Sequence, residues 1–182
     1  TAQRRGEVVN MEWDQYNDKT HLWTIPRENT KSDRQHEVPL SGLAVSTLEE
    51  CRPLGIFIFT SAGEKPFENV SRGKAELDRF IKKARKERGE LNIGAWRLHD
   101  LRRTAASGMA RLGVAPHVIE KVLNHTSGII SGVAAVYNRH KYKEEVGEAL
   151  KLWEGHVTEI LEKDFQSDGY APEFKIPREI KK

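Results

Sequence analysis

The sequence has little cysteine and no long apolar run, and each absence excludes a class of protein. Cys51 is the only cysteine among the 182 residues, which excludes an internal disulfide and a cysteine-rich metal site. No stretch is long and apolar enough to span a membrane, and no signal peptide is visible at the N-terminus. We therefore expect a protein without a membrane segment, in a reducing compartment such as the cytoplasm.

The chain also lacks a strong excess of charge of either sign. It has 30 basic and 27 acidic residues and a formal net charge of +3, so the total charge does not by itself indicate a nucleic-acid ligand. Charged residues make up 31% of the chain, so local clusters of charge matter more than the sum. A hydrophobic fraction of 37% over this length fits one folded domain with a sizeable core.

Hydrophobic periodicity predicts several helices and a few short strands. Strands are expected at 21–25, 35–40 and 56–59, and the polar segment 27–34 between the first two can form the turn of a hairpin. Helices are expected at 5–11, after Ser41, and at 71–88, 99–113, 116–125, 133–138 and 143–162. Residues 126–132 are expected to form a loop, and the tail from residue 163 to 182 is expected to be irregular.

The helix predicted at 99–113 carries the most unusual pair of residues. His99 and Arg102 are three positions apart, so they lie on neighbouring positions of one helix surface. They flank an apolar stripe, whereas Arg103 points away from it. The stripe consists of Leu101, Ala105, Met109 and Leu112.

The order Arg, Lys, His-x-x-Arg, His, Tyr along the chain resembles the tyrosine recombinases, the family of phage integrases and related site-specific DNA recombinases. The resemblance extends from residue 1 to about residue 143. Its motifs are Thr1-x-x-Arg4-x-x-Glu7, Lys31 after Asn29-Thr30, His99-Asp100-Leu101-Arg102-Arg103-Thr104, Leu123-Asn124-His125 and Val136-Tyr137-Asn138-Arg139.

The resemblance implies a metal-free cleavage and rejoining of DNA strands, without a cofactor, through a 3′-phosphotyrosine intermediate. Arg4 and Arg102 would bind the phosphate, because a guanidinium donates two parallel hydrogen bonds and keeps its charge. Glu7 would support the first arginine. Tyr137 would be the nucleophile. Lys31 would protonate the 5′ leaving oxygen, His99 would assist proton transfer at the nucleophile, and His125 matches the third-box histidine of the family.

Several of these assignments have alternatives. Arg5 competes with Arg4, Arg27 and Arg34 are substitutes for Lys31, and Tyr142 competes with Tyr137. The gap between His125 and Tyr137 is a few residues longer than is common in the family, and Asn124 stands where glycine is common.

The resemblance also implies a fold class, a domain and partners. Residues 1–182 would be a tyrosine recombinase catalytic core, mostly α with a small antiparallel β-sheet (α+β). Because the chain starts without Met inside the first motif, we expect a piece of a longer protein that lacks the family's N-terminal core-binding domain. Expected partners are double-stranded attachment-site DNA, three further copies in a homotetramer, and accessory DNA-bending proteins. The expected location is the cytoplasm of a bacterium that carries a phage or prophage.

Three other functions use parts of the same residue set. A type IB topoisomerase shares the residues but relaxes supercoils as a monomer. A DNA-binding module without turnover would leave the joint presence of His99, Arg102, His125 and Tyr137 unexplained. A metal hydrolase using His99, Asp100 and His125 lacks a compact ligand motif such as His-Glu-x-x-His.

Overall fold

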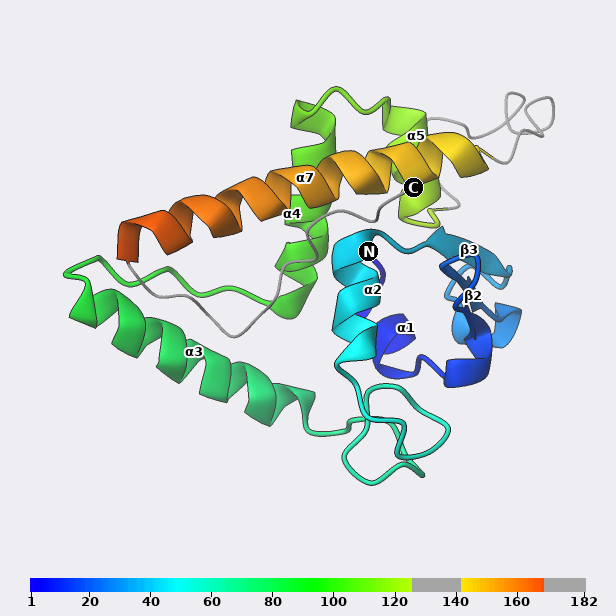
Figure 1. Cartoon of the computed structure of the whole chain (residues 1–182), viewed down its shortest axis with the longest axis horizontal. Coiled ribbons are helices and arrows are strands. Elements are labelled where there is room, and N and C mark those ends of the chain that lie inside the picture. Colours follow the sequence, from blue (N-terminus) through cyan, green and yellow to red (C-terminus); the bar gives the residue numbers. More distant parts are fainter. Residues whose placement is uncertain (126–141, 169–182) are drawn as a thin grey trace.

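The computed structural model describes residues 1–125 and 142–168 (Figure 1). It is mostly helical with one small antiparallel sheet, which confirms the expected fold class. The helices are α1 (Arg5–Val9), α2 (Gly42–Glu49), α3 (Val70–Glu87), α4 (Leu98–Arg111), α5 (Pro116–Val122) and α7 (Lys143–Asp168), with short 3-10 turns at Trp13–Gln15 and Arg27–Asn29. The predicted loop at 126–132, the helix predicted at 133–138 with Tyr137, and residues 169–182 of the predicted irregular tail lie outside the described residues. The prediction of an irregular tail from residue 163 is wrong for 163–168, because these residues continue helix α7.

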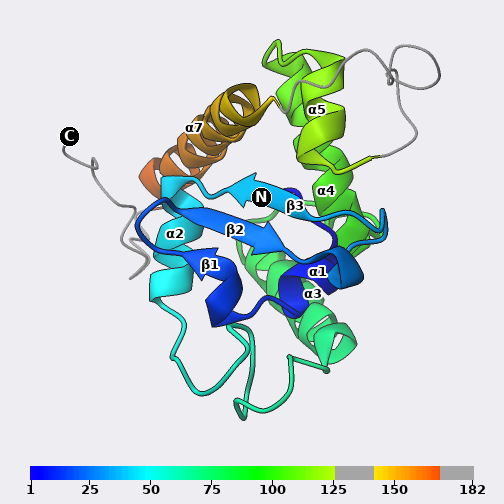
Figure 2. The same cartoon turned by 90° about the vertical axis from the view of Figure 1, so that its right-hand side faces the viewer.

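The sheet contains three strands in the order β1-β2-β3, with β1 at Tyr16–Asn17, β2 at Leu22–Ile25 and β3 at His36–Pro39 (Figure 2). Trp23 of β2 pairs with Val38 of β3, and both are 1% exposed. This confirms the predicted hairpin. The prediction of a strand at 56–59 is wrong. The segment contributes one isolated bridge, between Phe57 and Glu12, because the chain bends around it.

The long helix α7 packs against both helices and the sheet. It packs against α4, α5 and β3 of the same chain, and Figure 1 shows it crossing α4 and passing above α2. Val146, Ala149 and Leu150 are its buried residues at the α5 and β3 end. The Leu43 amide, at the start of α2, donates a hydrogen bond to the Glu154 carboxylate of α7. No helix in the described part of the chain has both the length and the apolarity to cross a bilayer.

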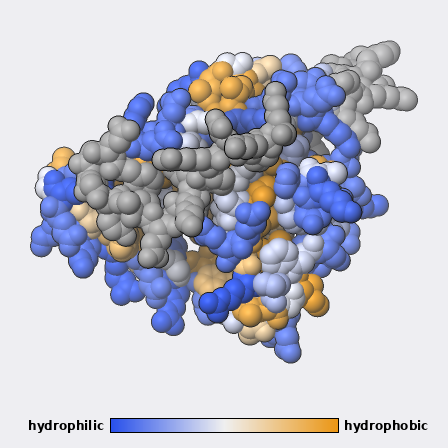
Figure 3. Space-filling model, in the orientation of Figure 1, coloured by the Kyte–Doolittle hydropathy of each residue, from blue (hydrophilic) through white to orange (hydrophobic). Residues whose placement is uncertain are grey.

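The apolar stripes of α4 and α3 are less buried than their sequence patterns suggest. In α4, Ala105 and Met109 are buried, but Leu101 is 57% exposed because Arg102 takes the inward position beside it. In α3 no residue is buried, and Phe80 of its apolar stripe is 70% exposed. Figure 3 accordingly shows hydrophobic residues, in orange, scattered over a largely hydrophilic surface.

Gly108 allows α4 and α7 to approach each other closely. A Cβ atom on Gly108 would lie 2.1 Å from Cζ3 of Trp153. We therefore expect Gly108→Ala to lower the free energy of unfolding by about 1–3 kcal/mol through overpacking, despite the better helix propensity of alanine. Urea denaturation measures the change. Adding Trp153→Leu to Gly108→Ala should recover part of the loss.

Gly155 of α7 is the matched control. A Cβ there has no atom within 4 Å, so Gly155→Ala should stabilise the protein by about 1 kcal/mol through helix propensity alone. Equal effects at the two glycines would contradict the close contact between α4 and α7.

Candidate active site

Arg4 is the residue immediately before helix α1, and Glu7 fixes it there. The Arg4 amide donates to Oε2 of Glu7 at 2.9 Å, and Nη1 of Arg4 donates to Oε1 at 2.7 Å. Glu7 is 5% exposed, whereas Arg4 is only half-buried. The carboxylate therefore holds both the backbone and the guanidinium of Arg4 from the inner side. The rival Arg5 is exposed and has no such partner among the described residues.

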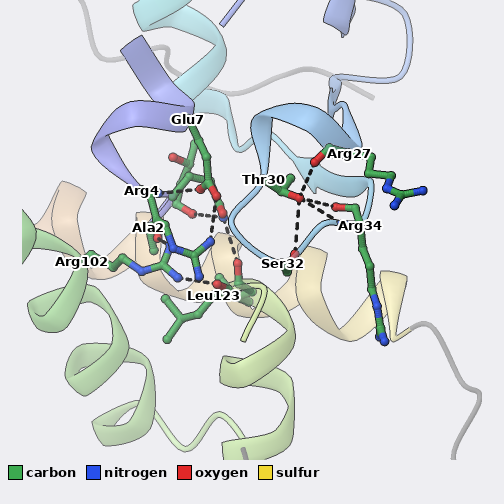
Figure 4. A network of polar contacts seen from close by, with 12 residues as sticks. Ala2, Arg4, Glu7, Arg27, Thr30, Ser32, Arg34, Arg102 and Leu123 are labelled. Carbon is green, nitrogen blue, oxygen red and sulfur yellow. Dashed lines mark hydrogen bonds and ion pairs between the residues drawn. The ribbon is translucent and has the colours of Figure 1, made fainter. Parts of the chain in front are cut away.

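Arg102 is buried, with 6% exposure, and two backbone carbonyls orient it. Nη1 donates to the Ala2 carbonyl at 2.6 Å, and Nη2 donates to the Leu123 carbonyl. Its remaining N–H groups make no hydrogen bond with the described residues, so they can donate to an anion. Figure 4 shows the guanidinium groups of Arg4 and Arg102 close to each other below Glu7. The structure thus brings together the two arginines that the sequence assigned to the phosphate.

The electrostatic environment of Arg102 suits an anionic ligand. Burial and the nearby Arg4 lower the pKa of Arg102 to about 10, while Glu7 and Glu120 act in the opposite direction. The guanidinium therefore remains charged at neutral pH. Two cations side by side, only partly balanced by buried Glu7, favour the binding of a negatively charged group between them.

Gln3 links the first motif to the end of α5. It is 6% exposed, and its Nε2 donates to the Val122 carbonyl at 2.9 Å. The next carbonyl, that of Leu123, accepts from Arg102. The end of α5 therefore fixes both the segment before Arg4 and the side chain of Arg102. The sequence analysis missed Gln3, because nothing in the chain pattern shows that residues 3 and 122 are in contact.

Lys31 lies in the turn between β2 and β3, as predicted. Thr30 organises this turn: its buried hydroxyl lies 3.0 Å from the Arg27 carbonyl and 2.8 Å from the Arg34 carbonyl, and it accepts from the Arg34 amide at 3.1 Å. Lys31 is exposed and has no hydrogen bond or ion pair with the rest of the described chain. Figure 4 shows the turn beside the arginine pair.

The two other arginines of the turn are less suitable as proton donors. Arg27 forms a double hydrogen bond with Asp33, at 2.7 Å for each N···O pair, and the Asp33 hydrogen bond raises the pKa of Arg27. The backbone of Arg34 helps to close the turn through Thr30, and a guanidinium, in Arg34 as in Arg27, does not give up a proton near neutral pH. Lys31 is therefore the better candidate for an acid in this turn.

His99 is exposed in the first turn of α4, three positions before Arg102, and it faces two cavities. The larger cavity, of about 840 Å³, extends past Arg102 toward the 51–59 segment. The smaller cavity, of about 540 Å³, is bordered by Arg5, Lys74, Trp96 and Arg97. Arg103 lies on the outside of α4 with a 75% exposed side chain, as predicted. His99 can therefore be reached from solvent beside the arginine pair.

His125 follows the end of α5, and a carboxylate orients its ring. Nδ1 of His125 lies 2.9 Å from Oε2 of Glu120, so a proton is favoured on Nδ1 and Nε2 is left for a ligand. Asn124 has a φ of +48°, a left-handed conformation that glycine and asparagine adopt most readily. This explains why Asn124 can replace the glycine common at this position. Glu120 was missed, because the sequence does not indicate its contact with His125.

Of the two candidate tyrosines, only Tyr142 is among the residues that the structure describes. Tyr137 lies outside the described residues. Tyr142 is half-buried, and its ring centroid is 5.0 Å from that of His117 in α5. The Tyr142 carbonyl accepts from the Val146 amide at 2.9 Å and so begins α7. Tyr142 thus has a packing role at the start of the last helix.

Asp100 has a structural partner. Its carboxylate accepts from the Arg97 amide at 2.9 Å, and this backbone hydrogen bond is the main cause of its lowered pKa. Within 1–125 and 142–168, no group of three or more histidine, cysteine or acidic residues could hold a metal ion.

Two comparisons with known proteins found matches for this chain. The profile of the phage integrase family matches residues 1–144. The prophage integrase IntA of Escherichia coli is 31% identical over 157 residues, which are 84% of this chain and 35% of that protein. The chain thus spans about a third of the length of this relative. No solved structure matches the chain. The chain belongs to the phage integrase family.

Proposed function

We propose that this chain is the catalytic domain of a site-specific DNA recombinase, which cuts and rejoins DNA strands without a metal ion through a 3′-phosphotyrosine. The observation that carries the proposal is the convergence of Arg4 and Arg102 beside the Lys31 turn. Glu7 holds Arg4, and two backbone carbonyls hold Arg102. The two guanidinium groups would bind the non-bridging oxygens, on which negative charge accumulates during the reaction.

The other groups would take the proton-transfer and nucleophilic steps. The oxygen of Tyr137 attacks the phosphorus, the bond to the 5′ oxygen breaks, and Lys31 gives that oxygen its proton. His99 assists removal of the tyrosine proton, and Nε2 of His125 contacts the phosphate. Rejoining reverses these steps, because the phosphotyrosine retains the energy of the broken bond.

The proposed ligand is double-stranded DNA at an attachment site, bound by four copies of the protein with accessory DNA-bending proteins. The smaller cavity next to His99 is suited to contacts with the DNA phosphate backbone, since Arg5 and Arg97 border it. Such contacts supply affinity rather than sequence recognition. The basic end of α3 is a weaker candidate, because Lys83 and Arg85 pair with Glu87 and Glu90.

A covalent trapping assay tests the proposal. The wild-type chain is incubated in EDTA with an attachment-site duplex that is nicked next to the cleavage point and labelled on the 5′ side of it. We expect a protein–DNA adduct that survives denaturation. DNA binding without an adduct would favour a binding module, and cleavage only after addition of a divalent metal would favour a hydrolase. Relaxation of a supercoiled plasmid without an attachment site would favour a topoisomerase.

Lys31→Met tests the proposed acid. We expect it to slow adduct formation by about 10²–10⁴-fold, because the 5′ oxygen would leave without a proton. A substrate with sulfur in place of the bridging 5′ oxygen should restore the wild-type rate, since a thiolate leaves without protonation. Lys19→Met, in the exposed turn between β1 and β2, is the matched control and should react normally. A Lys31→Met defect that persists with sulfur would contradict the acid role.

A further inference from the structure

His125 is fixed to the end of α5 by its own backbone. The last carbonyls of a helix have no partner in a following turn, so they need donors from elsewhere. Here the His125 amide donates to the Glu120 carbonyl at 3.0 Å, and the Asn124 amide donates to the Lys121 carbonyl at 3.1 Å. With Asn124 in the left-handed conformation, this is a Schellman motif. The position of His125 therefore follows that of the end of α5.

The next two carbonyls of α5 accept hydrogen bonds from side chains of the two other motifs. The Leu123 carbonyl accepts from Arg102, and the Val122 carbonyl accepts from Nε2 of Gln3 at 2.9 Å. The same Nε2 donates to the Thr1 carbonyl at 2.8 Å, so both hydrogens of the amide are in use. Gln3 therefore joins the first motif directly to the end of α5, across 119 positions of sequence.

The amide of Gln3 serves as a donor and not as packing. Gln3 is 6% exposed, and its Oε1 is buried without a hydrogen bond from the described residues. A buried acceptor without a donor is unfavourable, so packing alone would favour an apolar side chain at this position. What the amide adds is its two donors. A glutamate of the same shape would place a carboxylate against two carbonyl oxygens.

We propose that Gln3 is a positioning residue, which fixes the end of α5 to the first motif and so sets the position of His125 relative to the arginine pair. This inference rests on the proposed function, in which Nε2 of His125 contacts the phosphate. The two arginines keep supports of their own, which are a carboxylate for the first and the Ala2 carbonyl for the second. Without the Gln3 hydrogen bond, His125 is the group that would shift.

The test compares substitutions at Gln3 with the same change at a second glutamine. Gln3→Met keeps the length of the side chain and removes both donors. Gln3→Asn keeps the amide but is one methylene shorter, so it is the milder variant. Gln15→Met is the matched control, because Oε1 of Gln15 accepts from Nε1 of Trp23 at 3.3 Å, between a 3-10 turn and the sheet. Each variant is measured for thermal stability, for DNA affinity by fluorescence anisotropy, and for the single-turnover rate of adduct formation.

We expect Gln3→Met to slow adduct formation by about tenfold to a hundredfold, because a misplacement of about 1 Å can cost about a hundredfold in rate. Gln3→Asn should show a smaller loss, and DNA affinity should stay at the wild-type level in both variants. Gln15→Met should react at a rate near that of the wild type. A wild-type rate for Gln3→Met, or an equal loss for Gln15→Met, would overturn the positioning role.

A double-mutant cycle separates positioning of His125 from a general loss of structure. Gln3→Met is introduced into the wild type and into His125→Ala, at a temperature where all the proteins are folded. Coupled residues give non-additive effects. Once His125 is absent, Gln3→Met has no histidine to misplace, so it should change the remaining rate little. The same fold loss in both backgrounds would show that Gln3 acts on the fold as a whole, and would overturn the inference.

Spectra recorded without DNA separate this inference from the proposed function. In ¹⁵N–¹H spectra of the wild type, we expect both side-chain amide hydrogens of Gln3 to exchange slowly with D₂O. The ring signals of His125 should move in Gln3→Met and stay in place in Gln15→Met. If the wild type forms no adduct with DNA, the proposed function is what fails, and these spectra still decide on the link. Rapid exchange of the Gln3 amide, or an unchanged His125 ring in Gln3→Met, would overturn it.

Discussion

Tyr137→Phe abolishes the covalent DNA adduct, and Tyr142→Phe leaves it at the wild-type level: this is the largest effect that we expect from a single substitution. Phenylalanine keeps the ring and removes the one atom that can attack phosphorus, so no slower route to the phosphotyrosine remains. The measurement is the trapping assay in EDTA, with both variants at equal concentration. DNA binding should persist in both, because neither change removes a basic group.

The contacts of Tyr142 are the reason for expecting this difference. Its ring packs against His117, and Nζ of Lys121 lies 6.0 Å from the ring centroid. It also borders the hydrophobic core, and its backbone is held in a left-handed conformation with φ +53°. A nucleophile has to reach the phosphate in line with the leaving oxygen, and a tyrosine packed on α5 is poorly placed for that.

The same pair of variants can also contradict the assignment. If only Tyr142→Phe abolished the adduct, the reaction would still be that of the family, but the nucleophile would be Tyr142 and not Tyr137. An adduct that survives both substitutions together would exclude both tyrosines. Since each variant loses only one oxygen, a difference between them reports on chemistry more than on folding. Thermal stability provides the control for folding of the two variants.

The fold was predictable wherever periodicity is strong and local. Pro116 at the first position of α5, the hairpin around Lys31 and the long repeat of α7 all have clear signals, and the structure contains each of them. Periodicity identifies the apolar face of a helix but does not identify a partner for that face. This explains why α3 forms as predicted while Phe80 remains exposed.

The sequence predicted which residues form the candidate site, but it did not predict the groups that hold them in place. Arg102 was expected beside an apolar stripe, yet it is among the most buried residues of α4. Hydrophobicity scales treat arginine as an outward residue, and its burial depends on carbonyls 100 and 21 positions away in the sequence. Gln3 and Glu120 support the site through similar long-range or helix-end contacts. A single sequence contains no signal for such contacts.

Arg102→Lys is expected to slow adduct formation by about 10²–10³-fold, the usual effect of removing one donor to a developing charge. A lysine keeps the positive charge, but its single ammonium cannot bond two carbonyls on different segments and also present two parallel donors to a phosphate. The comparison is made in single-turnover experiments, at a temperature where circular dichroism shows both proteins folded. Arg103→Ala, one position further on and exposed, should leave the rate unchanged.

Arg102→Ala should affect both the chemistry and the fold, and the difference between the two variants separates these contributions. Alanine leaves the buried carbonyl of Leu123 and the part-buried carbonyl of Ala2 without their donor, and an unsatisfied buried group costs about 1–3 kcal/mol. We therefore expect a clear decrease in the free energy of unfolding for Arg102→Ala and a smaller one for Arg102→Lys. If Arg102→Lys cleaves at the wild-type rate, the charge alone is sufficient and the two-point phosphate contact is wrong. If both variants keep wild-type stability but lose the adduct, the carbonyl contacts matter for orientation and not for folding.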